Sequence, residues 1–164
     1  MNTSTSFRRL PALVTLALAG LLFQAQAWSD DKPSPDADRI DALLHQSGYT
    51  YEQKAPGVWV IPQKGDSLGD FKVIVAVGDG ITVVFVIVAA KADMDMDQDL
   101  AYKMLHMNHE YDRVKIGVDD DGDAFVRADA SVRVLDETEF KDIVHQVSAS
   151  ADEVHAAIKP YLKQ

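Results

Sequence analysis

The segment Ile81–Ala89 constrains the fold of this chain more than any other part of the sequence. Every position in it except Thr82 is apolar, and most of its side chains are β-branched. Successive side chains of a strand point to opposite faces of the sheet, so a strand with this sequence needs cover on both faces. We expect the helices of the same domain to cover one face. The other face then requires a partner subunit, a ligand or more of this chain.

Glycine-containing turns divide the surrounding residues into further strands. Turn signals stand at Ala55–Gly57, at Gly65-Asp66 and at Gly78–Gly80. They separate four segments that we interpret as antiparallel strands in two hairpins, over residues 49–54, 58–61, 71–77 and 81–89. The Gly-Asp-Gly segment is expected to close the second hairpin.

Helical periodicity appears on both sides of this strand region. Apolar residues three and four apart predict a helix over residues 38–46 and another over residues 98–110. Asp97 or Asp99 is suitably placed to cap the first turn of the second helix.

The C-terminal part of the chain predicts one more hairpin and two closing helices. Residues 113–118 and 124–134 alternate as strands, and capping-box spacings begin at Asp136 and again at Ser150. The last helix should end near Pro160. The predicted fold class is α+β, an antiparallel sheet with helices packed on one face, in the order α-ββββ-α-ββ-αα.

The N-terminal residues 1–27 have the pattern of a secretory signal peptide. Arg8 and Arg9 precede an apolar stretch from Leu10 to Phe23, and Ala25-Gln26-Ala27 is a small-x-small cleavage site. The apolar stretch is about 14 residues long, whereas a membrane-spanning helix needs roughly 20. We therefore expect cleavage after Ala27, a flexible acidic leader over residues 28–37 and a single domain over residues 38–164. The expected location is the periplasm, with secretion to the medium as the alternative.

The predicted order of helices and strands resembles that of a known family, and the local match lies in the second half of the sequence. A helix over Leu100–Asn108 is followed by the strand Lys115–Val118, an acidic turn with glycine, and the strand from Ala124 to Val134. This order is similar to that of type III secretion chaperones and the YbjN-like family. The resemblance, over Asp38–Leu162, implies an α+β domain that is often dimeric and binds other proteins, with no catalytic residues to carry over. Secretion chaperones act in the cytoplasm, so their effector-delivery role does not transfer to a chain with an export signal.

Composition excludes several functional classes. The chain has no cysteine, which rules out a disulfide scaffold, a thiolate metal centre and a cysteine nucleophile. It carries 26 acidic and 16 basic side chains and has no basic patch in its sequence, so a nucleic-acid partner is not expected. No serine lies in a strand-to-helix glycine elbow, and the Gly-Asp-Gly turn lacks the lysine of a phosphate loop. We therefore expect neither an enzyme nor a cofactor.

Two side-chain clusters raise the question of a metal. Asp93, Asp95 and Asp97 alternate like the first ligands of a calcium loop, but the glycine and the final acid of that loop are missing. His106 and His109 lie three residues apart on the predicted helix, near several methionines. We favour core methionines and solvated histidines, and we keep these five residues as weak metal candidates.

The function predicted from sequence is an exported, non-enzymatic protein-binding module of the chaperone or adaptor kind. Its partner would be another polypeptide or a second copy of the chain in a homodimer, and we expect no membrane contact after signal cleavage. The candidate interface comprises apolar residues of two neighbouring strands: Trp59, Ile61, Val84, Val86 and Val88. The alternative is a periplasmic metal or small-ligand binding protein that uses the acidic or Met/His clusters.

Overall fold

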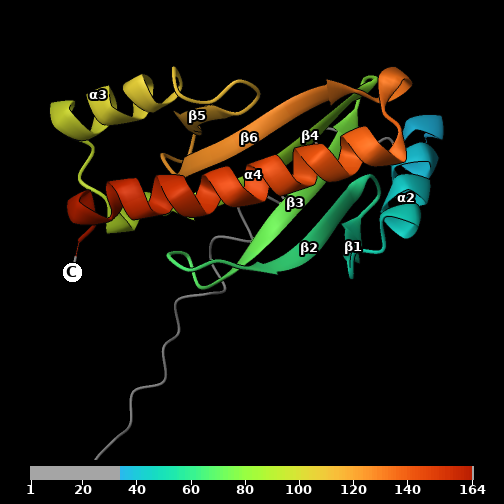
Figure 1. Cartoon of the computed structure of the whole chain (residues 1–164), viewed down its shortest axis with the longest axis horizontal. Coiled ribbons are helices and arrows are strands. Elements are labelled where there is room, and N and C mark those ends of the chain that lie inside the picture. The colour runs from blue at the N-terminus through green and yellow to red at the C-terminus, as the bar shows by residue number, and fades with distance from the viewer. Residues whose placement is uncertain (1–33, 164) are drawn as a thin grey trace, which may run out of the picture.

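A six-stranded antiparallel sheet with the order β1-β2-β3-β4-β6-β5 forms the centre of the structure, a computed structural model that describes residues 34–163 (Figure 1). The strands are β1 (Glu52–Ala55), β2 (Val58–Lys64), β3 (Asp70–Gly78), β4 (Ile81–Ala89), β5 (Lys115–Val118) and β6 (Ala124–Ser131). The helices are α2 (Pro35–Ser47), α3 (Gln98–Met107) and α4 (Glu137–Ile158). The predicted signal peptide and most of the predicted leader lie outside the described residues.

All three helices pack on one face of the sheet. In Figure 1, α4 crosses in front of the sheet, with α2 at one end and α3 at the other. This arrangement confirms the predicted α+β class with helices on one face. Within residues 34–163, no helix has the combination of length and hydrophobicity needed to cross a membrane.

The closing helix differs from its prediction. The two capping-box patterns predicted two helices, but α4 runs without interruption for 22 residues. Only the first pattern acts as a cap, because the Asp136 side chain accepts a hydrogen bond from the Glu139 backbone N–H. Ser150 is buried inside the helix, and no glycine or proline interrupts residues 137–158. The apolar positions of both predicted helices therefore continue one 3.6-residue period along the sheet.

The hairpin between β3 and β4 is closed by the predicted turn. Gly78 pairs with Ile81, which leaves a two-residue loop of Asp79 and Gly80 with φ values of 51° and 74°. Two successive positive φ angles are typical of the type I′ turn, whose twist matches that of the strands it connects.

Several element ends differ from their predicted positions, including the start of β1 at Glu52, the end of β2 at Lys64 and the end of α3 at Met107, and two further ends have a clear local cause. Helix α2 begins at Pro35, within the predicted leader, because the Ser34 side chain caps it. Strand β6 stops at Ser131, three residues early, because residues 132–134 form a 3₁₀ turn toward α4. This turn leaves Val132 buried and Val134 64% exposed.

Asn108, just after α3, holds the edge strand β5 in place. Its Nδ2 donates to the carbonyl oxygens of Met104 and Ile116, at 3.1 and 3.0 Å. Its Oδ1 accepts from the Ile116 backbone N–H at 2.8 Å. The side-chain amide thus forms hydrogen bonds with both the backbone N–H and the backbone C=O of Ile116, as a neighbouring strand would.

Candidate functional site

The five apolar residues of the predicted interface lie in the core. Trp59, Ile61, Val84, Val86 and Val88 are each at most 3% exposed, on the face of the sheet that the helices cover. The indole N–H of Trp59 donates to Asp41 of α2, at 3.1 Å. The structure therefore places these side chains beneath the helices of their own chain, not on a docking surface.

The opposite face of the sheet is only partly buried. Strand register places the alternate side chains of β2, β3, β4 and β6 together on this side. Its half-buried apolar members are Val58, Ile74, Ala76, Val83, Phe85, Ile87 and Phe125, and its central charged members are Lys115, Arg127 and Asp129. We call these ten residues the open face.

One row across the open face joins apolar and basic side chains. Ile74 pairs with Phe85, Phe85 pairs with Arg127, and Arg127 pairs with Lys115. The row therefore passes from an aliphatic and an aromatic side chain to two cations across four strands. Beside it, the Arg127 guanidinium lies 5.8 Å from the centroid of the Phe125 ring. The Phe125 ring also lies over Gly117, where an added Cβ would be 2.8 Å from the ring.

The charged part of the open face is a three-residue cluster. Lys115 and Arg127 both donate to the same oxygen, Oδ2 of Asp129, and the Arg127 contact is 3.1 Å long. Burial raises the pKa of Asp129, but the hydrogen bonds from Lys115 and Arg127 outweigh this effect and lower the pKa overall. Two cations share one carboxylate, so the cluster carries a net positive charge.

The sequence predicts only part of this cluster. The alternation of residues 124–134 predicts Arg127, Asp129 and Arg133 on one solvated or interfacial strand face, and the structure places Arg127 and Asp129 there. Arg133, the second base that this pattern predicts beside Asp129, is not part of the cluster, because residue 133 lies in the 3₁₀ turn after β6. Lys115 takes that place because β5 pairs with β6 in a register that sets Lys115 opposite Arg127.

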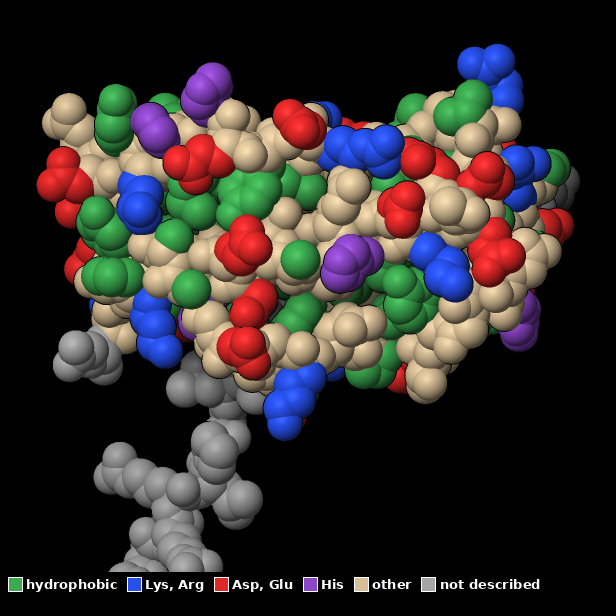
Figure 2. Space-filling model, in the orientation of Figure 1, with side chains coloured by type: hydrophobic (Ala, Val, Ile, Leu, Met, Phe, Trp, Pro, Cys, Tyr) green, Lys and Arg blue, Asp and Glu red, His purple; other side chains and the backbone are tan. Residues whose placement is uncertain are grey.

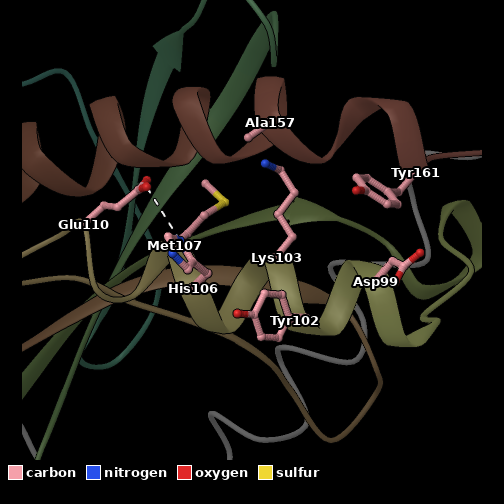
Figure 3. Close-up of a pocket in the computed structure, with 8 residues that line it drawn as sticks. All are labelled: Asp99, Tyr102, Lys103, His106, Met107, Glu110, Ala157 and Tyr161. Carbon is pink, nitrogen blue, oxygen red and sulfur yellow. Dashed lines mark ion pairs between the residues drawn. The ribbon is translucent and has the colours of Figure 1, made fainter.

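A second surface feature is a hollow of about 430 Å³ between α3 and the end of α4 (Figure 3). It is lined by Asp99, Tyr102, Lys103, His106, Met107, Glu110, Ala157 and Tyr161. Figure 3 shows Lys103 pointing toward α4, whereas Tyr102 points away from it. The side chains of Tyr102 and Leu105 are 70% and 71% exposed. The outer side of α3 is therefore a second exposed apolar surface.

The weak metal candidates are not brought together. Asp97 caps α3 by accepting from the Leu100 N–H, and Asp95 pairs with Lys163 at 3.0 Å. His106 contacts Glu110 at 3.7 Å, and its ring lies 6.5 Å from that of His109, measured between centroids. Across residues 34–163, no group of three or more histidine, aspartate or glutamate side chains has an arrangement that would hold a metal ion.

The loop between β2 and β3 contains a contact that sequence reasoning missed. The Ser67 hydroxyl lies 2.8 Å from Nδ1 of His155 on α4. The Asp152 carboxylate accepts from the backbone N–H groups of Asp66, Ser67 and Leu68, at 2.8–3.1 Å. These N–H groups would otherwise be the donors for an oxyanion beside Ser67. Since Asp152 occupies them, we interpret the cluster as a clamp that holds the loop on α4.

The Asp152 clamp predicts a pH-dependent contribution to stability. The hydrogen bond from the Leu68 N–H is the largest cause of a lowered Asp152 pKa, burial opposes it, and bonds from Ser67 and Asp66 add to the lowering. A carboxyl whose pKa is lower in the folded state stabilises the fold above its unfolded pKa, and this contribution is lost as the pH falls through the folded pKa. We expect Asp152→Asn to lower the melting temperature by a few degrees above about pH 5, where the unfolded carboxyl is ionised.

The measurement is a series of thermal melts between pH 3 and pH 7. The difference between wild type and Asp152→Asn should shrink toward the acid end. The exposed Asp121→Asn in the β5–β6 turn is the matched control and should show a smaller difference. An Asp152→Asn effect that is the same at every pH would contradict the role of the ionised carboxylate.

Comparison with known proteins identifies the family. The family model YbjN, described as "Putative bacterial sensory transduction regulator", matches residues 36–160. The chain belongs to the YbjN family. A search of curated proteins gave no match.

The YbjN fold is also found in the solved structures that resemble this chain. YbjN from E. coli has a TM-score of 0.59 at 17% identity, over 77% of this chain and 95% of that chain. A chain of the heterodimeric ExoU-SpcU complex from the type III secretion system of Pseudomonas aeruginosa has a TM-score of 0.52 at 18% identity, over 76% and 98%. A chain of the ExsC-ExsE complex has a TM-score of 0.54 at 10% identity, over 73% and 93%. These similarities confirm the predicted resemblance to YbjN and to type III secretion chaperones at the level of the fold.

Proposed function

We propose that this YbjN-family protein is an exported, non-catalytic polypeptide-binding module, and that its open face holds a segment of another polypeptide. The row from Ile74 through Phe85 to Arg127 carries the proposal, because it combines partly exposed apolar side chains with a cation beside them. Two of the similar solved structures are complexes of two proteins, which supports a protein-binding role for this fold.

The edges of the sheet are less suitable for a partner than its open face. On β5, Asn108 already occupies both backbone groups of Ile116. On the other edge, β1 is four residues long, exposed, and irregular in register between Gln53 and Ala55. Short, bulged and covered edges discourage strand addition. A polypeptide is therefore expected to bind through side-chain contacts with the face of the sheet.

The test uses a disulfide-bonded protein that has been reduced and carboxymethylated, so that it stays unfolded, and labelled with fluorescein. Its binding to this chain is measured by fluorescence anisotropy. We expect wild type to bind it and the double variant Ile74→Ser/Phe85→Ser to bind at least about tenfold more weakly, since burying one such side chain contributes roughly 1.5–3 kcal/mol. The control is Tyr102→Ser/Leu105→Ser, which removes apolar area of the same kind from α3 and should bind like wild type.

Two results would overturn this assignment. Weakened binding in the α3 control alone would move the site to α3. Absence of binding by wild type would reject the polypeptide-binding function. Circular dichroism of each variant establishes that it is folded before its affinity is compared.

The proposed location is the periplasm, on the basis of the signal-peptide pattern in residues 1–27. Cell fractionation followed by N-terminal sequencing tests this part. The expected product begins at Trp28 and is released by osmotic shock. An intact Met1 terminus in the cytoplasmic fraction would contradict export.

A further inference from the structure

From the charge of the open face we infer that its partner is an acidic segment in which an apolar residue is followed, three positions later, by a carboxylate. This inference rests on the proposed polypeptide-binding function and narrows it to one class of partner. It depends on three features of the described residues: the sign of the charge on this face, the spacing of its apolar and basic side chains, and the accessibility of the basic ones.

The face of the sheet that carries the open face has the opposite charge balance to the whole protein. The chain has 26 acidic and 16 basic side chains, for a net charge of −10. Among the strand residues on this side of the sheet, the basic side chains are Lys54, Lys64, Lys72, Lys115 and Arg127. The acidic ones are Glu52, Asp70 and Asp129. An acidic partner is thus attracted to this side, whereas the net negative charge of the whole chain repels it; the helix-bearing side shows acidic and basic side chains interspersed (Figure 2).

The basic side chains of the central cluster remain accessible. The side chains of Lys115 and Arg127 are 61% and 41% exposed, although both contact Asp129. Asp129 accepts from both of them through a single oxygen, Oδ2. Each cation therefore has hydrogen-bonding capacity left for a second carboxylate, since lysine has three donors and arginine five. The Phe125 ring beside Arg127 supplies an apolar surface next to the ionic contact.

The spacing between the apolar and basic groups selects a sequence pattern. Ile74 and Arg127 share one row but lie two strands apart, and strands are spaced about 4.8 Å apart, so the separation is about 10 Å. A polyproline II chain repeats every three residues and rises about 3.1 Å per residue, so residues i and i+3 point to one side about 9 Å apart. An apolar side chain at i over Ile74 and Phe85 then places a carboxylate at i+3 beside Arg127.

The experiment uses four labelled 12-residue peptides built from serine, glycine and two leucines, with affinity measured by anisotropy at low salt. Three of them carry glutamine, glutamate or lysine at the third position after the second leucine. The fourth carries glutamate directly after that leucine. We expect the i+3 glutamate peptide to bind about tenfold more tightly than the glutamine peptide, and the lysine peptide to bind most weakly. The i+1 glutamate peptide should gain less, and the gain should fall as salt screens the charges.

Two variants test whether the higher affinity for the i+3 glutamate peptide comes from the cluster of Lys115, Arg127 and Asp129. The triple variant Lys115→Gln/Arg127→Gln/Asp129→Asn removes the charges without leaving one unpaired. It should bind the glutamine peptide as wild type does and lose the glutamate preference. Lys141→Gln, which removes a basic charge from α4, is the control and should keep that preference.

The outcomes separate this inference from the proposed function. Equal affinity of wild type for the glutamine and glutamate peptides overturns the acidic partner and leaves polypeptide binding intact. A glutamate preference that the triple variant retains also overturns it. Failure of all four peptides and of the unfolded protein rejects both. A dimer in sedimentation velocity that Phe85→Ser dissociates would show that a second copy occupies the face, and would reject the acidic partner.

Discussion

Val84→Lys is expected to abolish folding, whereas Val83→Lys, the same change at the preceding residue, should leave the protein folded. Val84 is fully buried under the helices, and a lysine there would be a charge without a partner. Such a group costs several kcal/mol, a large part of a total stability of about 5–15 kcal/mol. Val83 lies on the half-buried open face, where a lysine can extend its ammonium group into solvent. We expect Val83→Lys to change stability by about 1 kcal/mol or less.

Soluble yield, far-ultraviolet circular dichroism and urea unfolding of the two variants measure this difference. The comparison also tests the interface predicted from sequence. A Val84→Lys protein that stays folded but loses self-association would place Val84 at an interface between copies. The same melting behaviour in both variants would contradict the division of the sheet into a buried and an open face.

Asn108→Ala is expected to destabilise the protein by about 3 kcal/mol. The substitution removes three hydrogen bonds and leaves the N–H and C=O of Ile116 without their partner in a partly buried place. Removing one partner of a buried polar group costs about 1–3 kcal/mol, and here two backbone groups are affected. Because β5 is an edge strand, the loss should loosen its pairing with β6 before the rest of the sheet unfolds.

Urea unfolding gives the free-energy change, and amide hydrogen exchange locates it. The expected exchange pattern is faster exchange at residues 115–118 than in β3 and β4. The control is His109→Ala, because His109 is the exposed neighbour of Asn108 and should change stability by less than about 0.5 kcal/mol. An Asn108→Ala protein as stable as this control would show that water replaces the side-chain amide at no cost.

The contact between Lys115 and Asp129 in the candidate site could not be predicted from the sequence. The alternating segment around Lys115 indicated a strand, and the segment around Asp129 indicated a solvated face. The contact between them depends on the register of β5 against β6, which pairs Lys115 with Arg127. Register is determined by the fit of a whole strand to the core and to its turn, so the spacing of residues within one strand did not predict it.

Asp152 is a second example, because its partners lie far away in the sequence. Its carboxylate binds backbone N–H groups of residues 66–68. Backbone groups have no signature of their own in the sequence, and any acid on the polar side of α4 would have looked the same. The Ser67–His155 contact depends on the same docking of the loop against the helix.

Local features determined by the sequence alone include the turn at Asp79-Gly80, the cap at Asp136, and the order of helices and strands before the closing helix. They follow from short-range preferences of backbone and side chains, which act within a few residues. Only the tertiary structure decided which face of Ile81–Ala89 is buried. Both faces of that strand are apolar, so its sequence is compatible with either choice. The helices decided it, because α4 packs on the side of Val84 and leaves Val83 and Phe85 on the open face.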